Sequence, residues 1–424
     1  MRLIILNQFF YPDHSATSQL MTSLAESLVE RGVTVTALAG RGRYNGGEKL
    51  PPREKHNGVC IERAWATSFG KHRTLGRLSD YFSFFLGAAW KLMRLPSAEV
   101  VMALTTPPMI GLVALLIGRF RGMRVVSVIQ DVYPDIAVRL GTLGPRSAST
   151  KALEWINMYV LKHSDRLVVL SEPMRERIAA KVGDIRASRI DVIHNWADGN
   201  EIRPITQPHN PFVLEHALAG SFVVLFSGNL GLVNEFSTVL EAARLLRERS
   251  DIVFLFVGEG AREIEILEYK RKHSLANVKL LPYQPRTMLP YSLAAGNALL
   301  VTLADGLAGL CEPSKVYAIM AAGRPLLFVG DQQSETAKLI AVNQCGAVIA
   351  SGNHERLADV ISDWSSDRSK SEEFGRAARA LFEERFDQPQ AVNKYLETFA
   401  NCVSLAPAIS EPPHREVRIK DIVL

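Results

Sequence analysis

Short apolar runs alternate with helix-length segments along most of the chain. The first run, LIIL near the N-terminus, precedes a segment from Ser15 to Arg31 in which leucine and methionine recur at helical spacing. Gly32 ends that segment, and a second apolar run extends from Val33 to Leu38. This order of strand, helix and strand predicts the opening βαβ unit of a Rossmann-like domain.

The same alternation continues through both halves of the chain. Short, continuous apolar runs bounded by turn residues are typical of buried parallel strands. The further runs of this kind are Val100–Leu104, Arg124–Gln130, Arg166–Leu170, Ile190–Ile193, Phe222–Gly231, Ile252–Val257 and Val278–Leu281. We therefore predict an α/β protein in which helices cover parallel sheets.

The length of the chain indicates more than one such domain. At 424 residues it exceeds a typical single domain, and two domains of about 200 residues are the usual expectation. Three prolines cluster with polar residues between Asn195 and Phe212, a composition typical of a linker. We predict a first domain over residues 1–200, a second over 201–385, a helix over 386–402 and a mobile tail over 403–424.

Several strands predicted in the second half end in glycine or proline turns. Gly228 and Gly231 follow one strand in the run FSGNLG, Gly258-Glu259-Gly260 follows the next, and Pro282–Pro285 follows the third. The carboxyl ends of parallel strands meet at one edge of a sheet, where open α/β folds bind ligands. Glycine also lets ligand oxygens approach the backbone closely, so this edge is a candidate phosphate site.

The segment EPSKVYAIMAAGRP, from Glu312 to Pro325, places a cation at the start of a predicted helix. Pro313 suits the first helical turn, and Ser314 and Lys315 follow it. A helix N-terminus with a lysine attracts a diphosphate, because free N–H groups and positive charge coincide there. The alternative is that Lys315 is a solvated lysine on a surface helix.

In their order along the chain, FSGNLG, FVGEG, NVKLLPYQP and EPSKVYAIMAAGRPLLFVG resemble the nucleotide-sugar half of family 4 glycosyltransferases. The resemblance extends from the N-terminus to about Phe399 and is strongest to bacterial members that build exopolysaccharide or O-antigen units. It implies the GT-B fold: two Rossmann-like domains facing each other across a cleft, with a C-terminal helix crossing back to the N-terminal domain. It also implies a retaining transfer from a nucleotide-diphosphate sugar, with UDP favoured, to a polyprenyl-linked or oligosaccharide acceptor.

The resemblance assigns roles to particular positions. The first domain would bind the acceptor and the second the donor, with Lys315 as phosphate cation. The donor-binding residues would be Gly228, Asn229, Gly231, Glu259, Tyr283, Ser314 and Lys315, with Tyr283 beside the nucleobase. The acceptor-binding residues would be His14, Ser15 and Thr17 in the loop before the first helix. Asp131, which directly follows a strand, would orient a sugar or acceptor hydroxyl, or else cap the next helix; Asp135 is the better candidate for a cap.

The chain departs from the family pattern at two positions. The arginine and lysine that usually follow the first donor-domain strand are absent, and Asn229 is the polar residue there. Ala318 stands where the second glutamate of the family's glutamate pair would hold the ribose. Two alternatives therefore stay open: a nucleotide-sugar epimerase of the same fold, or a non-catalytic nucleotide-binding subunit.

Positive charge is concentrated in the first half of the chain. Residues 1–200 carry 26 Lys and Arg against 17 Asp and Glu, and the segment Arg41–Arg124 alone carries 14 against 5. That segment also holds the aromatic cluster Tyr81–Leu86 and Trp90. Aromatic residues beside basic ones are typical of a helix that lies on an anionic membrane, but the same rings could be core. No apolar stretch reaches the roughly 20 residues that span a bilayer, and no nucleic-acid-binding module is recognisable.

The remaining composition indicates a cytoplasmic enzyme on the inner face of the plasma membrane. The four cysteines show neither disulfide nor metal-ligand spacing, and the first apolar run is too short for a signal peptide. We find no Asp-x-Asp run or histidine pair that would hold a metal. We therefore expect no cofactor and no metal, with the nucleotide sugar as substrate.

Overall fold

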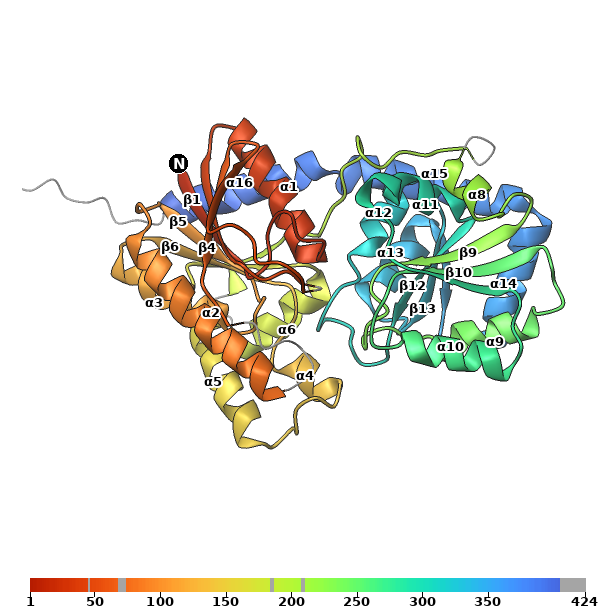
Figure 1. Ribbon diagram of the computed structural model, residues 1–424, viewed down its shortest axis with the longest axis horizontal. Coiled ribbons are helices and arrows are strands. Elements are labelled where there is room, and N and C mark those ends of the chain that lie inside the picture. The colour runs from red at the N-terminus through yellow and green to blue at the C-terminus, as the bar shows by residue number, and fades with distance from the viewer. Residues whose placement is uncertain (45, 68–73, 184–186, 207–209, 405–424) are drawn as a thin grey trace, which may run out of the picture.

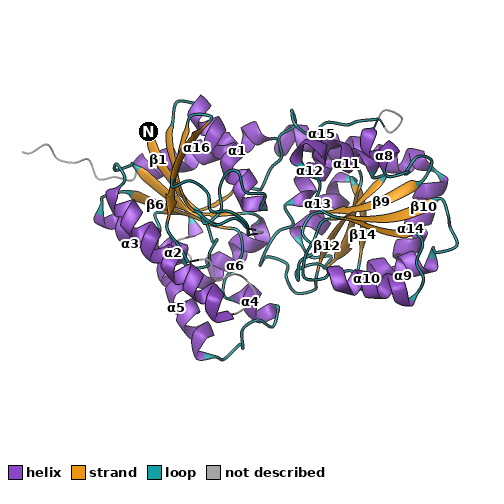
Figure 2. Ribbon diagram, viewed as in Figure 1, coloured by secondary structure: helices purple, strands orange, loops and turns teal. Residues whose placement is uncertain are grey.

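The computed structural model describes residues 1–44, 46–67, 74–183, 187–206 and 210–404 (Figure 1). Two α/β domains lie side by side, each built on its own parallel sheet, and the chain joins them along one side (Figures 1 and 2). The predicted tail over 403–424 lies almost wholly outside the described residues. The predicted fold class is confirmed, including the C-terminal helix that returns to the N-terminal domain.

The N-terminal domain has an eight-stranded sheet in the order β3-β4-β2-β1-β5-β6-β7-β8. Only β3 is antiparallel to its neighbour. The strands are β1 (Arg2–Leu6), β2 (Thr34–Gly40), β3 (Arg53–His56), β4 (Val59–Ala64), β5 (Val100–Ala103), β6 (Arg124–Ile129), β7 (Arg166–Val169) and β8 (Ile190–Val192). The central strands β1, β5 and β6 are buried except at the first residues of β1 and β6, as their continuous apolar runs predict.

Helices cover both faces of this sheet. One face packs against α1 and α16 through a core that includes Leu24 and Phe399, and the other packs against α2 and α3 through Phe84 and Ala114. The helices are α1 (Ala16–Glu30), α2 (Thr74–Arg94), α3 (Ile110–Phe120), α4 (Asp135–Arg139), α5 (Ala148–His163), α6 (Glu172–Val182) and α16 (Gln388–Ser404).

The C-terminal domain has a six-stranded, wholly parallel sheet in the order β11-β10-β9-β12-β13-β14. The strands are β9 (Phe222–Ser227), β10 (Ile252–Val257), β11 (Val278–Leu281), β12 (Ala298–Leu303), β13 (Leu326–Gly330) and β14 (Gly346–Ile349). The helical elements are α8 (Pro211–Glu215), α9 (Ser237–Leu245), α10 (Glu263–Lys272), η2 (Arg286–Met288), α11 (Leu289–Ala295), α12 (Lys315–Ala321), α13 (Glu335–Asn343), α14 (His354–Ser366) and α15 (Arg368–Arg385).

The two domains are connected by packing as well as by chain. One hydrophobic core runs from Met174 on α6 through Leu310 to Phe382 on α15, so it includes residues of both domains. After α15 the chain returns to the N-terminal domain, where Trp196 packs edge-on against Tyr395 of α16. The segments that follow β6 and β7 contact the segment that follows β12, so these carboxyl strand ends of the two sheets lie together.

Candidate functional site

Three contacts join segments that follow strands of the two domains. Asp131, just beyond β6, forms a β-bridge with Cys311, and the Val132 N–H donates to the Leu310 carbonyl at 2.8 Å. The Ser171 hydroxyl donates to Glu312 Oε1 at 2.7 Å. The segment before α12 therefore meets the N-terminal domain within a few residues of Lys315.

Lys315 is the first residue of α12, and its ammonium group is buried. Its Nζ has no hydrogen-bond partner among the described residues and lies 3.3 Å from the centre of the Phe226 ring. Because burial disfavours the charged form and no carboxylate compensates, the pKa of Lys315 falls to about 7. The site therefore has a cation that needs an anionic ligand, and the interpretation of Lys315 as a solvated surface lysine is wrong.

The Gly228 turn lies directly against this lysine. A Cβ on Gly228 would stand 3.7 Å from Lys315 Nζ, and Gly228 has φ of +130°, which favours glycine. A Cβ on Gly258 would lie only 2.1 Å from the Gly228 carbonyl oxygen, so the two turns can pack together only because Gly258 has no side chain. The Gly228 N–H already donates to the Val257 carbonyl at 2.9 Å, so this N–H is not free to bind a ligand. What the turn provides is room for a ligand to approach the backbone.

The other predicted donor-binding residues lie around the same turns. The Asn229 side chain packs against two glycines. A Cβ on Gly231 would lie 2.9 Å from Asn229 Nδ2, and a Cβ on Gly260 would lie 2.7 Å from Asn229 Oδ1. The backbone carbonyl of Glu259 accepts from the Leu230 N–H at 2.9 Å. The Glu259 side chain is exposed.

Tyr283 and Ser314 complete the predicted donor set. The Tyr283 ring is 42% exposed, and burial of its hydroxyl together with Tyr44 and Glu259 raises its pKa to about 12. Since Tyr44 belongs to the N-terminal domain, Tyr283 lies at the cleft. Ser314 occupies the N-cap of α12, but its side chain makes no capping hydrogen bond.

Asp131 belongs to the N-terminal domain and pairs with Cys311, which precedes α12 in the C-terminal domain. Its backbone N–H, like that of Gln130, is directed at the Thr105 hydroxyl, at 3.4 Å and 3.2 Å respectively. Burial raises the pKa of the Asp131 carboxyl to about 6. Asp131 does not cap α4, whose N-cap is Pro134, so the capping alternative is wrong. Asp135 is not a cap either: it is the first residue of α4, and its carboxylate accepts from Lys181 at 2.7 Å.

Glu312 and Ser171 are site residues that we did not predict. Burial raises the pKa of Glu312 to about 7, although the Ser171 hydrogen bond opposes that rise. Glu312 opens the segment that drew attention to Lys315, so its position along the chain was a usable signal. The contribution of Ser171 depends on domain packing and has no sequence signature.

The predicted acceptor loop is organised by Asp13, another residue that we did not predict. Its carboxylate accepts from the backbone N–H of Ser15 at 2.8 Å and of Tyr44 at 2.6 Å. Ser15 is the N-cap of α1, yet its buried hydroxyl has no partner among the described residues. His14 is exposed and Thr17 is half-buried in the first turn of α1.

Comparisons with known proteins agree with this arrangement. The model of the glycosyl transferase 4-like domain matches residues 17–196, and the model of glycosyl transferases group 1 matches residues 215–381. The chain belongs to the family 4 glycosyltransferases.

Two curated relatives and a solved structure are similar to the glycosyltransferase. WbjE of Pseudomonas aeruginosa, named as a probable glycosyltransferase, is 28% identical over 342 residues, which is 80% of this chain and 83% of WbjE. WcaI of Escherichia coli, named as a colanic acid biosynthesis glycosyl transferase, is 25% identical over 268 residues, 62% of this chain and 63% of WcaI. The crystal structure of HepE of Anabaena in complex with UDP and glucose superposes with a TM-score of 0.72 over 94% of this chain and 99% of HepE, at 15% identity. That superposition establishes the GT-B fold.

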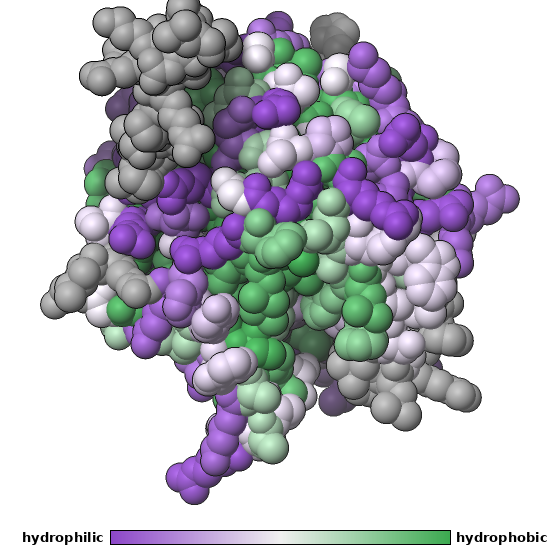
Figure 3. All heavy atoms as spheres, turned by 90° about the vertical axis from the view of Figure 1, so that its left-hand side faces the viewer, coloured by the Kyte–Doolittle hydropathy of each residue, from purple (hydrophilic) through white to green (hydrophobic). Residues whose placement is uncertain are grey.

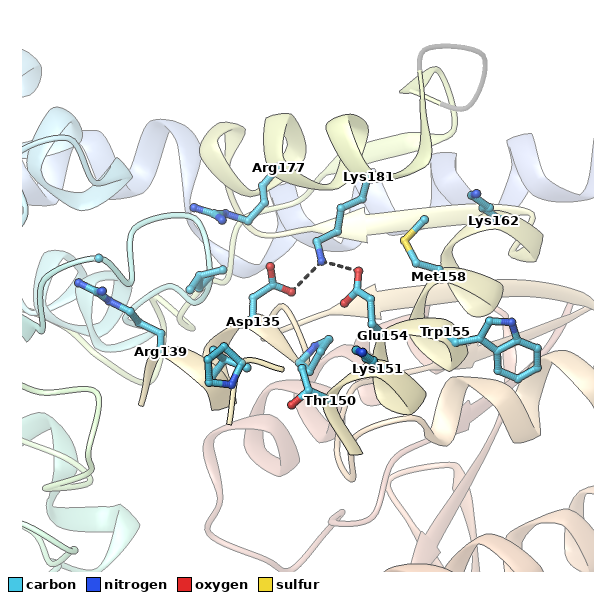
Figure 4. Close-up of a pocket in the computed structure, with 15 residues that line it drawn as sticks. Asp135, Arg139, Thr150, Lys151, Glu154, Trp155, Met158, Lys162, Arg177 and Lys181 are labelled. Atoms are coloured by element: carbon cyan, nitrogen blue, oxygen red, sulfur yellow. Dashed lines mark hydrogen bonds and ion pairs between the residues drawn. The ribbon is translucent and has the colours of Figure 1, made fainter. Parts of the chain in front are cut away.

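A cavity of about 980 Å³ lies between the two domains of the glycosyltransferase (Figure 4). It is bounded by α4, α5 and α6 of the N-terminal domain and by Gly306 and Leu310 of the C-terminal domain. Lys181 stands between Asp135 and Glu154, at 2.7 Å and 2.9 Å from their carboxylate oxygens. None of the predicted site residues lines this cavity.

Proposed function

We propose that this glycosyltransferase moves a sugar from a UDP-sugar to a polyprenyl-linked or oligosaccharide acceptor, with retention of anomeric configuration, in bacterial surface polysaccharide synthesis. The observation that carries the proposal is the buried, unpartnered ammonium of Lys315 against the Gly228 turn. The UDP and glucose in the HepE complex support the donor class, and the name of WcaI supports the polysaccharide product.

In this mechanism the sugar–phosphate bond loosens before the acceptor hydroxyl bonds to the anomeric carbon. Negative charge then develops on the departing nucleoside diphosphate, and Lys315 stabilises it. Asp131, across the cleft, orients a hydroxyl of the sugar or acceptor. Asn229 and Glu259 line the donor side, Tyr283 stacks on the nucleobase, and no metal or other cofactor takes part. Ser15 directs its unpartnered hydroxyl at the acceptor, with His14 and Thr17 beside it.

The N-terminal domain also carries the surface that would hold the enzyme on the inner face of the plasma membrane. Exposed apolar side chains follow one face of α2 and the neighbouring face of α3: Phe82, Leu86, Trp90, Met93, Leu116 and Phe120. We call this set the α2–α3 face. Figure 3, which views the side of the molecule that carries α3, shows a hydrophobic band with hydrophilic residues on both sides.

Basic residues border the α2–α3 face. The Arg94 guanidinium lies 3.9 Å from the Trp90 ring centre, and Arg119 and Arg121 follow at the end of α3. Apolar side chains that can enter a bilayer, next to arginines that attract anionic lipid, support peripheral attachment. Among the described residues, no helix is both long enough and apolar enough to cross a bilayer.

The experiment that tests the proposed reaction incubates the purified protein with a panel of nucleotide sugars and a membrane extract. We expect labelled sugar from one UDP-sugar to move into the lipid fraction. Conversion of the donor into an isomeric nucleotide sugar would instead indicate an epimerase. Binding of UDP without either reaction would indicate a nucleotide-binding subunit, which is the outcome that Ala318 at the glutamate position would favour.

A further inference from the structure

The cavity between α4, α5 and α6 is lined by more positive than negative charge. Five basic residues line it, Arg139, Lys151, Lys162, Arg177 and Lys181, against Asp135 and Glu154. Both carboxylates form ion pairs with Lys181, so neither is paired with the other four basic side chains. The other four cations leave the cavity with an unneutralised positive field (Figure 4).

Those four cations are available to an anionic ligand. Within the described part of the chain, Lys151 and Lys162 have no ion pair, and both are exposed on α5. Arg177 makes one long contact, 3.5 Å to the Ala308 carbonyl. Arg139 donates to the Asp305 carbonyl at 3.0 Å and 3.2 Å, which engages its N–H groups without neutralising its charge.

The same cavity has an apolar side. Trp155, which is 71% exposed, and Met158 line the cavity from α5, and Val138 and Leu310 line it as well. An indole that is largely in water is unfavourable by itself, and it offers a flat surface to the apolar face of a sugar or to a hydrocarbon chain. The cavity therefore combines phosphate-binding cations with a surface for an apolar group.

Its position links the reaction cleft to the α2–α3 face. Pro134 and Leu310 line the cavity, and they belong to the two segments that pair at Asp131 and Cys311. On the other side, α5 packs against α3, and Arg119 of α3 donates to the His163 carbonyl at the end of α5. A ligand in this cavity would have one end near Asp131 and the other toward the α2–α3 face.

We propose that this cavity binds the diphosphate of an isoprenyl-diphosphate-linked acceptor, with Lys151 and Arg177 on the phosphates and Trp155 against the adjoining apolar group. The inference rests on the proposed transfer to a lipid-linked acceptor and deepens it, because it places the charged linkage of that acceptor. The donor diphosphate is held elsewhere, by Lys315 on the C-terminal domain.

The test is a calorimetric titration of the full-length protein with farnesyl diphosphate in the presence of saturating UDP, which keeps the donor site occupied. We expect farnesyl diphosphate to bind, and the double variant Lys151→Gln/Arg177→Gln to bind it at least ~10-fold more weakly, since each substitution removes a charge-assisted contact. Arg175→Gln is the matched control, because Arg175 lies on α6 outside the cavity and pairs with Glu172. UDP affinity should be the same in all three proteins.

Further ligands separate the possible sources of the phosphate. Trp155→Ala should weaken farnesyl diphosphate binding and leave inorganic pyrophosphate binding unchanged. Equal affinity of the wild type for pyrophosphate and farnesyl diphosphate would overturn the assignment. It would also be overturned if farnesyl diphosphate failed to bind while the wild type and the double variant bound phosphatidylglycerol vesicles with equal affinity. So would equal farnesyl diphosphate affinity in the wild type and the double variant.

The transfer assay distinguishes failure of this inference from failure of the proposed function. If sugar transfer occurs and the double variant has an unchanged KM for the lipid acceptor, the inference is wrong and the proposed function stands. If farnesyl diphosphate binds as expected but no UDP-sugar supports transfer, the cavity assignment stands and the proposed function is wrong.

Discussion

The Lys315 ammonium is buried against an aromatic ring with no carboxylate within hydrogen-bonding distance among the described residues. Such a cation lowers the stability of the empty protein, because removing charge from water is costly when no partner compensates. The diphosphate of the proposed donor would supply the missing counter-charge. At the scale of the residue, the proposed function therefore accounts for a cation that is unfavourable in the empty protein.

Replacing this lysine should separate stability from activity. We expect Lys315→Ala to lose transfer by a factor on the order of 100 or more, because the departing diphosphate loses its cation. Lys315→Met, which keeps the volume, should raise the free energy of unfolding at neutral pH by about 1–3 kcal/mol, the usual cost of a buried polar group without a partner. Steady-state kinetics and urea unfolding measure the two effects. Transfer at the wild-type rate in Lys315→Ala would remove Lys315 from the mechanism.

The lowered pKa of Lys315 also predicts how donor affinity depends on pH. Below pH 7 the free enzyme carries the charged ammonium, and above pH 7 it is increasingly neutral. Because bound diphosphate favours the charged form, affinity for a UDP-sugar should fall as pH rises from 7 to 9, and binding should take up protons in that range. Calorimetry in buffers of different ionisation enthalpy measures the uptake. Lys315→Met provides the control, since proton uptake in that variant should be lost.

Asp131 provides a second test at this scale. If its carboxylate orients a reacting hydroxyl, Asp131→Asn should depress kcat by about 10- to 100-fold and leave the affinity for UDP unchanged. The variant keeps the size of the side chain, and the β-bridge to Cys311 uses only backbone atoms. Wild-type turnover per folded molecule would show that the carboxylate has no part in the reaction.

At the scale of the element, α2 shows how one helix serves both core and surface. Phe84, Ala88 and Leu92 are fully buried at helical spacing, whereas Phe82, Leu86 and Trp90 are exposed on the opposite side. The sequence left open whether the rings of Tyr81–Leu86 face a membrane or the core. Helical periodicity divides the cluster between these alternatives: Phe84 is core and Phe82 is exposed.

This division predicts the effect of substitutions on membrane binding. We expect the protein to sediment with anionic vesicles at low salt and to be partly released at high salt, since screening shortens the reach of the arginines to about 8–10 Å. Phe82→Ser/Trp90→Ser should weaken binding at every salt concentration and leave the melting temperature unchanged. Phe84→Ser, in contrast, should lower the melting temperature.

Two results of the vesicle assay would contradict this prediction. Equal binding to neutral and anionic vesicles would rule out the contribution of the arginines. Unchanged binding of the double serine variant would show that the α2–α3 face does not insert.

At the scale of the whole molecule, α16 makes the C-terminal end of the chain part of the N-terminal core. Val392, Tyr395 and Phe399 of this helix pack with residues of α1 and the first sheet. The Gln388 side chain also donates to the Ser23 and Ser27 hydroxyls of α1, at 2.7 Å and 2.8 Å. Because α16 follows the C-terminal domain in the sequence, the N-terminal core contains residues from both ends of the described chain.

This arrangement predicts an unequal response of the two domains to one substitution. Phe399→Ala should cost about 3–5 kcal/mol of stability, because it removes a fully buried ring, and the loss should fall on the N-terminal domain. If the donor binds to the C-terminal domain as proposed, UDP binding should persist at temperatures where the N-terminal domain has melted. Asn401→Ala, on the exposed side of α16, is the control. A single lowered transition that abolishes UDP binding at the same temperature would contradict the prediction.

The sequence by itself determined the α/β architecture and the glycine turns that pack beside Lys315. Buried parallel strands need continuous apolar runs, and glycine is needed where Gly228 and Gly258 approach each other, so both features are readable along the chain. The edge strand β3 and its neighbour β4 escaped prediction because they carry charged residues. Arg63 of β4 is buried, and it donates to the carbonyls of Tyr11 and Pro51 at 2.6 Å and 3.0 Å and pairs with the Glu54 carboxylate at 2.6 Å.

Only the tertiary structure decided how the domains meet. The contact of Ser171 with Glu312, the pairing of Asp131 with Cys311 and the cavity beside α5 each bring together residues far apart in the chain. Likewise, Lys315 could be a solvated lysine or a buried cation until the packing of Phe226 and the Gly228 turn around it was known. Local patterns specify which face of an element is apolar, whereas the partner that covers the face is set by the packing of the whole chain.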